Sequence, residues 1–200
     1  EVIHNGCDTE EIRSRAKLAR EKRPPNDSLR VIMVSRLDTI KDQKTLLKAF
    51  SLVKQTNWKL QLVGEGSKRM ELESLAINLG LNVKETFLGK RFDIPELLGQ
   101  ADLFAFSTTP AEGFGIVLIE AMAAGLPIIA SNVPACCEVL QEGDAGELLP
   151  YGDIESWSQK LRQLLLSNTQ RNELTKRSIK YAHKYDIKES ASNWYQLLKP

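Results

Sequence analysis

Six short apolar runs, each followed by a segment with helical periodicity, constrain the fold of this chain more than any other feature. Runs of this kind, apolar rather than alternating, are typical of parallel strands buried on both faces. Strands alternating with helices predict an α/β fold, a doubly wound parallel sheet of about six strands with helices on both faces. The expected strands are 29–35, 58–63, 85–88, 102–107, 127–131 and 146–150. In such sheets, ligands bind at the loops that follow the carboxyl ends of the strands.

Composition restricts the class of protein only broadly. Hydrophobic residues make up 42% of the 200 residues and charged residues 26%, and the net charge of +1 gives no argument for a nucleic-acid partner. The three cysteines lack the spacing of a disulfide framework or a zinc site, so a reducing cytoplasm is expected. Because the chain starts at Glu1, without a methionine and within an extended segment, we expect a piece of a longer protein.

The stretch 109–127 predicts a glycine-rich turn, then an apolar helix, then residues that terminate the helix. The helix is marked at its start by Glu112, Gly113 and Gly115, and at its end by Gly125 and Pro127. Apolar residues on every side predict a core helix: Ile116, Val117, Leu118, Ile119 and Met122. Glu120 is unusual there, because a buried carboxylate needs a partner. A nearby backbone group or cation could satisfy it, but we favour a ligand hydroxyl.

The spacing of the two carboxylates, Glu112 and Glu120, predicts an extended ligand. On one helix, eight positions would place them about 12 Å apart along the axis and about 80° apart around it. The paired acids of glycoside hydrolases lie closer, at roughly 5 to 9.5 Å. Free amides at a helix start bind anions. We therefore expect a hydroxylated group at Glu112, phosphates at 115–117 and a second hydroxylated group at Glu120.

Two cations, Arg36 and Lys41, follow the first predicted strand. Ligands bind at such strand ends in open α/β sheets. The flat guanidinium fork and the ammonium could together clamp a diphosphate. On chemistry alone, two solvated loop cations are an equal alternative.

Two other loops carry weaker signals. Gly64-Glu65-Gly66 lacks the third glycine of a dinucleotide fingerprint, which favours a tight strand-to-helix turn over a nicotinamide or flavin site. Lys90, Arg91 and Phe92 could stack on or border a nucleobase, and a solvated loop is at least as good an interpretation for each of them. Asp93 is expected to cap a short helix.

The motif around the two carboxylates resembles a known family. The segment Glu-Gly-Phe-Gly-Ile-Val-Leu-Ile-Glu, followed by Ala-Met-Ala-Ala-Gly-Leu-Pro-Ile-Ile-Ala-Ser, resembles the E-x7-E signature of the family 4 glycosyltransferases. These are retaining, nucleotide-sugar-dependent enzymes with the GT-B fold, which consists of two Rossmann-like domains. The resemblance covers nearly the whole chain.

Two further motifs support the resemblance, each with substitutions. Residues 35–42 resemble Gly-Arg-Leu-x-x-x-Lys-Gly, with Ser35 and Asp42 in place of the two glycines. Residues 134–138 resemble Gly-Gly-x-x-Glu, with Pro134 and Ala135 in place of the glycines. If those glycines approach the donor closely in the family, that part of the pocket differs here.

The resemblance implies a role for each candidate residue. The implied diphosphate ligands are Arg36, Lys41, Gly115, Ile116 and Val117. The implied donor-sugar contacts are Glu112, Gly113, Phe114 and Gly115. Ribose is assigned to Glu120, and the base to Lys90 and Arg91. The implied catalytic residues are Glu112, Arg36 and Lys41, with no metal and no cofactor.

The resemblance also implies how the chain is organised and what it binds. Residues 1–200 would form one Rossmann-like donor-nucleotide-binding domain, the C-terminal half of GT-B. Residues 1–8 would be a hinge from a missing N-terminal domain, and 186–200 a helix that crosses back to it. The expected partners are a UDP-, GDP- or ADP-linked sugar donor and a glycan or lipid-linked acceptor. The expected location is the cytoplasm or the inner face of the membrane, with peripheral membrane contact made by the full-length protein.

Two other functions remain open from the sequence. A non-catalytic nucleotide-binding module would keep the fold without transfer, and a GT-B nucleotide-sugar epimerase would turn over the donor without an acceptor. The basic stripe on 176–184 could touch anionic lipid, but a solvated face is favoured. Cys136 and Cys137 are interpreted as packing residues.

Overall fold

The computed structural model describes residues 4–24, 28–55 and 57–199. Residues 1–3 of the expected hinge, 25–27 of the expected loop after the first helix, and Pro200 of the expected crossing helix lie outside this range.

Within the described residues, six parallel strands form one sheet in the order β3-β2-β1-β4-β5-β6. The strands are β1 (Leu29–Val34), β2 (Trp58–Val63), β3 (Phe87–Gly89), β4 (Leu103–Phe106), β5 (Ile128–Ser131) and β6 (Glu147–Leu149). The order reverses between β1 and β4, as expected for a doubly wound sheet. The predicted fold class is confirmed.

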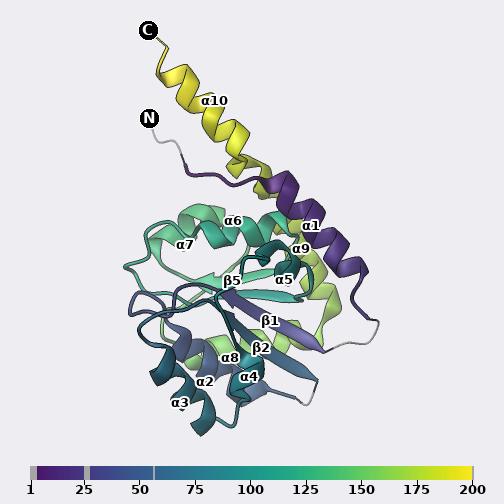
Figure 1. Ribbon diagram of the computed structural model, residues 1–200, viewed down its shortest axis with the longest axis vertical. Helices are drawn as coiled ribbons and strands as arrows, with labels where there is room; N and C mark the ends of the chain where they lie inside the picture. The colour runs from purple at the N-terminus through teal and green to yellow at the C-terminus, as the bar shows by residue number, and fades with distance from the viewer. Residues whose placement is uncertain (1–3, 25–27, 56, 200) are drawn as a thin grey trace.

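Helices cover both faces of the sheet (Figure 1). They are α1 (Thr9–Glu21), α2 (Gln43–Val53), α3 (Arg69–Asn78), α4 (Val83–Thr86), α5 (Ile94–Gly99), α6 (Ile116–Ala123), α7 (Pro134–Val139), α8 (Ile154–Leu166), α9 (Asn168–Ala182) and α10 (Ile187–Leu197), with 3-10 turns η1 (Gln141–Gly143) and η2 (His183–Tyr185). On one face α1 packs against α5 and α6, and on the other α2 packs against α3 and α8. Helix α9 contacts both α6 and α8.

The central strands form the core because their side chains are apolar on both faces. Ile32, Phe104 and Ile129 are fully buried on β1, β4 and β5. Burying each such side chain contributes roughly 1.5–3 kcal/mol relative to leaving it exposed. This rigid centre fixes the strand ends from which the site loops emerge.

Two local predictions were wrong. The strand expected at 85–88 is β3, and its first two residues belong to α4, because the Asn82 side chain accepts a hydrogen bond from the Lys84 amide at 3.1 Å and caps a helical turn. The dipeptide Asn5-Gly6 is typical of a turn, but no turn forms there. That segment instead pairs with the start of α10: the Cys7 amide donates to Tyr185 O at 3.1 Å and Cys7 O accepts from the Ile187 amide at 2.9 Å.

Candidate functional site

The loops after β1 and β4 are joined where the strand order reverses. The Asp42 amide donates to Ser107 O at 3.1 Å, and the Thr109 amide donates to Ile40 O at 2.9 Å. Lys41 and Thr108 form an isolated antiparallel bridge between these hydrogen bonds. Residues about seventy positions apart in sequence are thereby held side by side at the carboxyl edge of the sheet.

Lys41 and Glu112 form a buried ion pair there. Their side chains are only 10% and 9% exposed. The Glu112 carboxylate also accepts hydrogen bonds from Thr108 Oγ1 at 3.0 Å and from the Gly113 amide at 3.2 Å. The Lys41 ammonium lies 4.9 Å from the centre of the Phe106 ring. Two predicted site residues thus meet, and each neutralises the other.

Arg36, the other predicted cation, is exposed rather than buried. Its side chain is 74% exposed and pairs with Asp38 at 3.2 Å. Its backbone is fixed, since Arg36 O accepts a hydrogen bond from Gln43 Nε2 at 2.8 Å. Although the Asp38 side chain is only 19% exposed, the guanidinium itself lies largely in solvent, so it can reorient at low cost.

Helix α6 begins later than the carboxylate spacing assumed. Its N-cap is Gly115, at φ 80° in the left-handed region, and Glu112 lies in the preceding loop. The single-helix estimate of about 12 Å between the carboxylates therefore does not apply. The prediction of a helix apolar and buried on every side was also wrong for the first turn, because Ile116 is 41% exposed and Val117 is half-buried. No side chain caps this helix start, so its first amides are available to an anion.

A cavity of about 430 Å³ opens in front of this helix start. The predicted residues that line it are Arg36, Lys41, Glu112, Phe114, Gly115, Ile116 and Val117. The structure therefore brings together the residues assigned to the diphosphate and to the sugar, except Gly113, which lies in the loop beside Glu112.

A second cavity, of about 410 Å³, adjoins the first and shares the wall made by Val34, Ser35 and Arg36. Glu120, Lys90 and Arg91 line it. Burial raises the pKa of Glu120. Within the described part of the chain the Glu120 carboxylate has no hydrogen-bond or ion-pair partner, so a nearby backbone group or cation does not satisfy it.

The cations of the second cavity are partly engaged. The Lys90 ammonium lies 5.1 Å from the centre of the exposed Phe92 ring. Arg91 Nε donates to Asp93 at 2.8 Å, and this bond lowers the pKa of Asp93. Asp93 occupies the N-cap of α5 as expected, but its side chain makes no cap hydrogen bond, since Arg91 holds it.

The family described as glycosyl transferases group 1 matches residues 14–184. The chain belongs to this family. It is 36% identical over 136 residues to N-acetyl-alpha-D-glucosaminyl L-malate synthase of Bacillus anthracis, covering 68% of this chain and 35% of that protein. It is 31% identical over 195 residues to phosphatidyl-myo-inositol mannosyltransferase of Mycobacterium leprae, covering 95% of this chain and 50% of that protein. The chain thus spans half or less of the length of these relatives.

Solved structures share this fold. Anabaena HepE, solved in complex with UDP and glucose, superposes with a TM-score of 0.86 at 25% identity, over 99% of this chain and 56% of that chain. The glycosyltransferase WaaG, involved in lipopolysaccharide biosynthesis, superposes with a TM-score of 0.81 at 21% identity, over all of this chain and 56% of that chain. This group 1 glycosyltransferase chain therefore has the Rossmann-like architecture of GT-B proteins.

Sequence reasoning missed some residues of this candidate site. Thr108, Phe106 and Asn5 line the first cavity or hold its carboxylate, and Glu65 lines the second. The position of Thr108 directly after a buried strand was the available signal. Asn5 carried no such signal, because it reaches the site only through the packing of the N-terminal segment.

Gly64 and Gly66 have a structural role in this domain. A Cβ on Gly64 would lie 2.0 Å from Ser35 O, and one on Gly66 would lie 2.2 Å from Leu37 O. The two glycines let this loop lie directly on the loop after β1, where Leu37 N donates to Glu65 O at 2.9 Å. The two glycines therefore serve the tight turn by allowing the close approach of two loops at the site.

The described residues contain no cluster of three or more metal-ligating side chains. In the same part of the chain, each helix is too short or too polar to cross a membrane.

Proposed function

We propose that this chain is the donor-binding, C-terminal half of a retaining glycosyltransferase that uses a nucleoside-diphosphate sugar. One observation carries the proposal: Arg36, Lys41, Glu112, the uncapped start of α6 and Glu120 converge on two adjoining cavities at the point where the strand order reverses. The UDP in the HepE complexes makes a UDP-linked sugar the first donor to test.

The diphosphate lies in the first cavity, between Arg36, Lys41 and the amides of 115–117. As the bond to the sugar breaks, negative charge grows on the leaving diphosphate. Preorganised cations and helix amides stabilise that charge, which is the main catalytic contribution of this half. Arg36 reaches the phosphate by leaving its exposed pair with Asp38.

Glu112 takes the hydroxyls of the donor sugar through an exchange of partners. In this structure its charge is neutralised by Lys41. A diphosphate carries more negative charge than one carboxylate and draws the ammonium toward itself, which frees Glu112 oxygens for sugar hydroxyls. Because Thr108 and the Gly113 amide also donate to this carboxylate, we assign it to sugar binding rather than to nucleophilic attack.

Glu120 holds the ribose hydroxyls, and Lys90 and Arg91 border the base in the second cavity. A ribose diol supplies the donors that the Glu120 carboxylate lacks among the described residues. Both interpretations rest on the shared wall at Arg36, which joins the nucleoside cavity to the diphosphate cavity.

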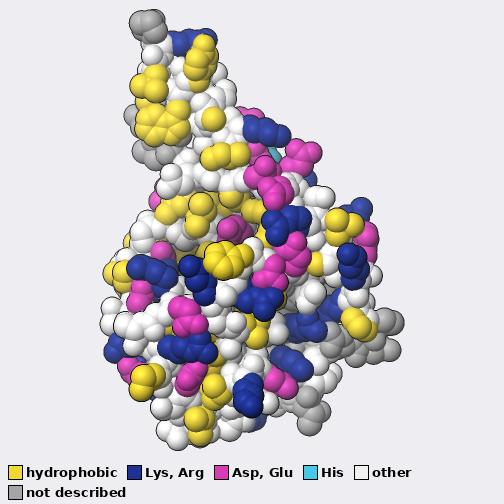
Figure 2. All heavy atoms as spheres, in the orientation of Figure 1, with side chains coloured by type: hydrophobic (Ala, Val, Ile, Leu, Met, Phe, Trp, Pro, Cys, Tyr) yellow, Lys and Arg dark blue, Asp and Glu magenta, His cyan; other side chains and the backbone are white. Residues whose placement is uncertain are grey.

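The acceptor, a glycan or lipid-linked molecule, binds mainly to an N-terminal domain that lies outside this chain. Hydrophobic side chains gather on α10, which projects from the body near the N-terminal segment (Figures 1 and 2). The exposed apolar residues of α10 are Ile187, Trp194, Tyr195 and Leu197, followed by Leu198. We assign this face to contact with the first domain, as the hinge at 1–8 requires. This half alone is expected to bind the donor without transferring sugar.

The test is calorimetric titration of this chain with UDP, GDP and ADP, with and without magnesium. One diphosphate is expected to bind without metal, and Arg36→Ala is expected to weaken that binding by about 1–3 kcal/mol, the cost of losing a charged hydrogen bond. Lys59→Ala is the matched control, because Lys59 lies near the start of β2, at the opposite edge of the sheet.

Equal affinity of the Arg36→Ala chain and the native chain would remove the diphosphate assignment. If no diphosphate binds at millimolar concentration, the same titration on the full-length protein distinguishes a site that needs the first domain from a module that has lost binding. Turnover of the donor by full-length protein without an acceptor would favour an epimerase.

A further inference from the structure

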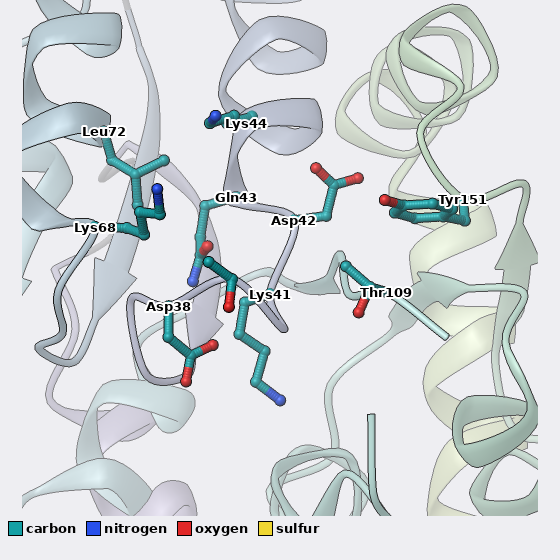
Figure 3. A pocket seen from close by; sticks show the side chains of 10 residues that line it. Asp38, Lys41, Asp42, Gln43, Lys44, Lys68, Leu72, Thr109 and Tyr151 are labelled. Atoms are coloured by element: carbon teal, nitrogen blue, oxygen red, sulfur yellow. The ribbon is translucent and has the colours of Figure 1, made fainter. Parts of the chain in front are cut away.

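A third cavity, of about 210 Å³, lies on the other side of the loop after β1 (Figure 3). Its walls come from the starts of α2 and α3 and from the residues after β4 and β6. Lys41 borders both this cavity and the diphosphate cavity. The third cavity is therefore adjacent to the proposed donor site but contains none of its other residues.

The cations around this cavity already have partners. Lys44 and Lys68 both bind the carboxylate of Glu71, the latter at 2.8 Å. Lys41 is paired with Glu112. Because Asp38 and Asp42 also line the cavity, these paired lysines give it no excess of positive charge for an anionic ligand such as phosphate, while Lys44 and Lys68 disfavour a bound metal cation.

Two oxygen acceptors at the cavity have no donor among the described residues: Gln43 Oε1 and Asp42 Oδ2. Gln43 is only 1% exposed, and its amide is oriented by hydrogen bonds from Nε2 to Ser35 Oγ at 3.1 Å and to Arg36 O at 2.8 Å. The other oxygen of Asp42 caps α2 by accepting from the Thr45 amide at 3.3 Å. Buried acceptors without donors are costly, so the cavity favours a ligand that brings hydroxyl groups.

An aromatic ring completes the cavity. Tyr151 is 48% exposed and lies across from the carboxylate of Asp42, with Thr109 below both in the view of Figure 3. An exposed aromatic face covers the apolar C–H face of a sugar ring, while carboxylate and amide oxygens accept from its hydroxyls. We propose that this cavity is a second saccharide subsite, which binds one sugar unit of a glycan outside the donor cleft.

Entry of a sugar requires a side chain to move, because both acceptor oxygens are covered. Lys44 and Lys68 line the cavity and are the side chains that can move: they are 53% and 37% exposed, and their shared partner Glu71 is 42% exposed. Exposed ion pairs of this kind contribute little to stability, so they open at low cost. The subsite does not depend on sugar transfer, and it can bind whether or not the donor assignment holds.

The test is NMR of this chain with the methyl glycosides of glucose, mannose and N-acetylglucosamine, by saturation transfer for the glycoside signals and by chemical-shift titration for the signals of the chain. At least one glycoside is expected to bind in the millimolar range and to shift the ring signals of Tyr151, identified by their loss in Tyr151→Phe. Tyr151→Ala and Asp42→Asn are each expected to weaken binding about tenfold. Asparagine keeps the oxygen that caps α2, and Tyr151 is half exposed, so both variants should fold.

Tyr195→Ala is the control, since Tyr195 is an exposed aromatic residue on α10. The affinity of this variant for the glycoside should equal that of the native chain. The subsite is excluded if no glycoside binds, or if Tyr151→Ala and Asp42→Asn both bind like the native chain. It is also excluded if inorganic phosphate produces the same Tyr151 shifts and displaces the glycoside. Glycoside binding by a chain that binds no nucleoside diphosphate would uphold the subsite and count only against the donor proposal.

Discussion

The two cavities of the proposed donor cleft contain the same kinds of charged group in different states. In the first, Lys41 and Glu112 are buried and satisfy each other. In the second, Glu120 is half-buried and has no partner among the residues that the structure describes, and Arg36 on the shared wall is exposed. The charges of the first cavity therefore satisfy each other in the free domain, whereas in our proposal the Glu120 carboxylate of the second cavity is satisfied by the ribose.

This difference separates folding from binding. A buried pair that loses one member leaves an uncompensated charge, so its substitution acts on stability as well as on ligand affinity. A carboxylate without a partner already destabilises the free chain, so its substitution acts mainly on the ligand. The predictions that follow test this separation.

The largest effect is expected from Lys41→Ala, which leaves the buried Glu112 carboxylate without its compensating charge. The free energy of unfolding should fall by about 3–5 kcal/mol. Urea denaturation of the native chain and the variant measures it, with Arg36→Ala as the control that should stay within about 0.5 kcal/mol of the native value. Adding Glu112→Gln to Lys41→Ala should recover much of the loss. A Lys41→Ala chain as stable as Arg36→Ala would show that the ion pair does not hold the first cavity.

The start of α6 gives a second, smaller test in the first cavity. Gly115→Ala should destabilise the chain by about 1–2 kcal/mol, because Gly115 has φ 80° and a Cβ would lie 3.3 Å from Leu118 Cδ1. Gly113→Ala is the matched control, since a Cβ there meets nothing within 4 Å. Equal stability of both variants in thermal denaturation would contradict the left-handed cap.

In the second cavity, Glu120→Gln should weaken the binding of ribonucleoside diphosphates by about 1 kcal/mol, since glutamine keeps one acceptor but loses the charge. The same substitution should weaken the binding of the 2′-deoxy analogues by less. Calorimetric titration of both ligand series gives the comparison. Equal losses for the two series would exclude the ribose assignment.

The smallest effect is the pH dependence of Glu120. Burial raises its folded-state pKa above the unfolded value of about 4.5, so its ionisation opposes folding. This destabilisation is absent below the unfolded pKa, grows as pH rises from about 4.5 through the folded pKa, and then stays constant. The stability advantage of Glu120→Gln over the native chain should therefore increase with pH in urea titrations. If the stability difference between Glu120→Gln and the native chain does not change as pH rises from about 4.5, burial does not perturb the pKa of this carboxylate.

Much of the fold could be predicted from the sequence. Six apolar runs alternating with helical segments predict a doubly wound sheet, because parallel strands buried on both faces need apolar residues throughout. The exceptions were local. At one of them, Asn82 caps a helical turn where a strand is expected, since a side-chain cap can override strand propensity over four residues.

The sequence by itself also determined which residues to consider for the site, because motif spacing and strand ends mark the chemistry that a phosphorylated, hydroxylated ligand needs. It could not determine their states. Whether a cation is buried and paired, as Lys41 is, or exposed, as Arg36 is, depends on contacts between segments about seventy residues apart. Only the packing of the loops after β1 and β4 decides that, and with it which oxygens are left for a ligand.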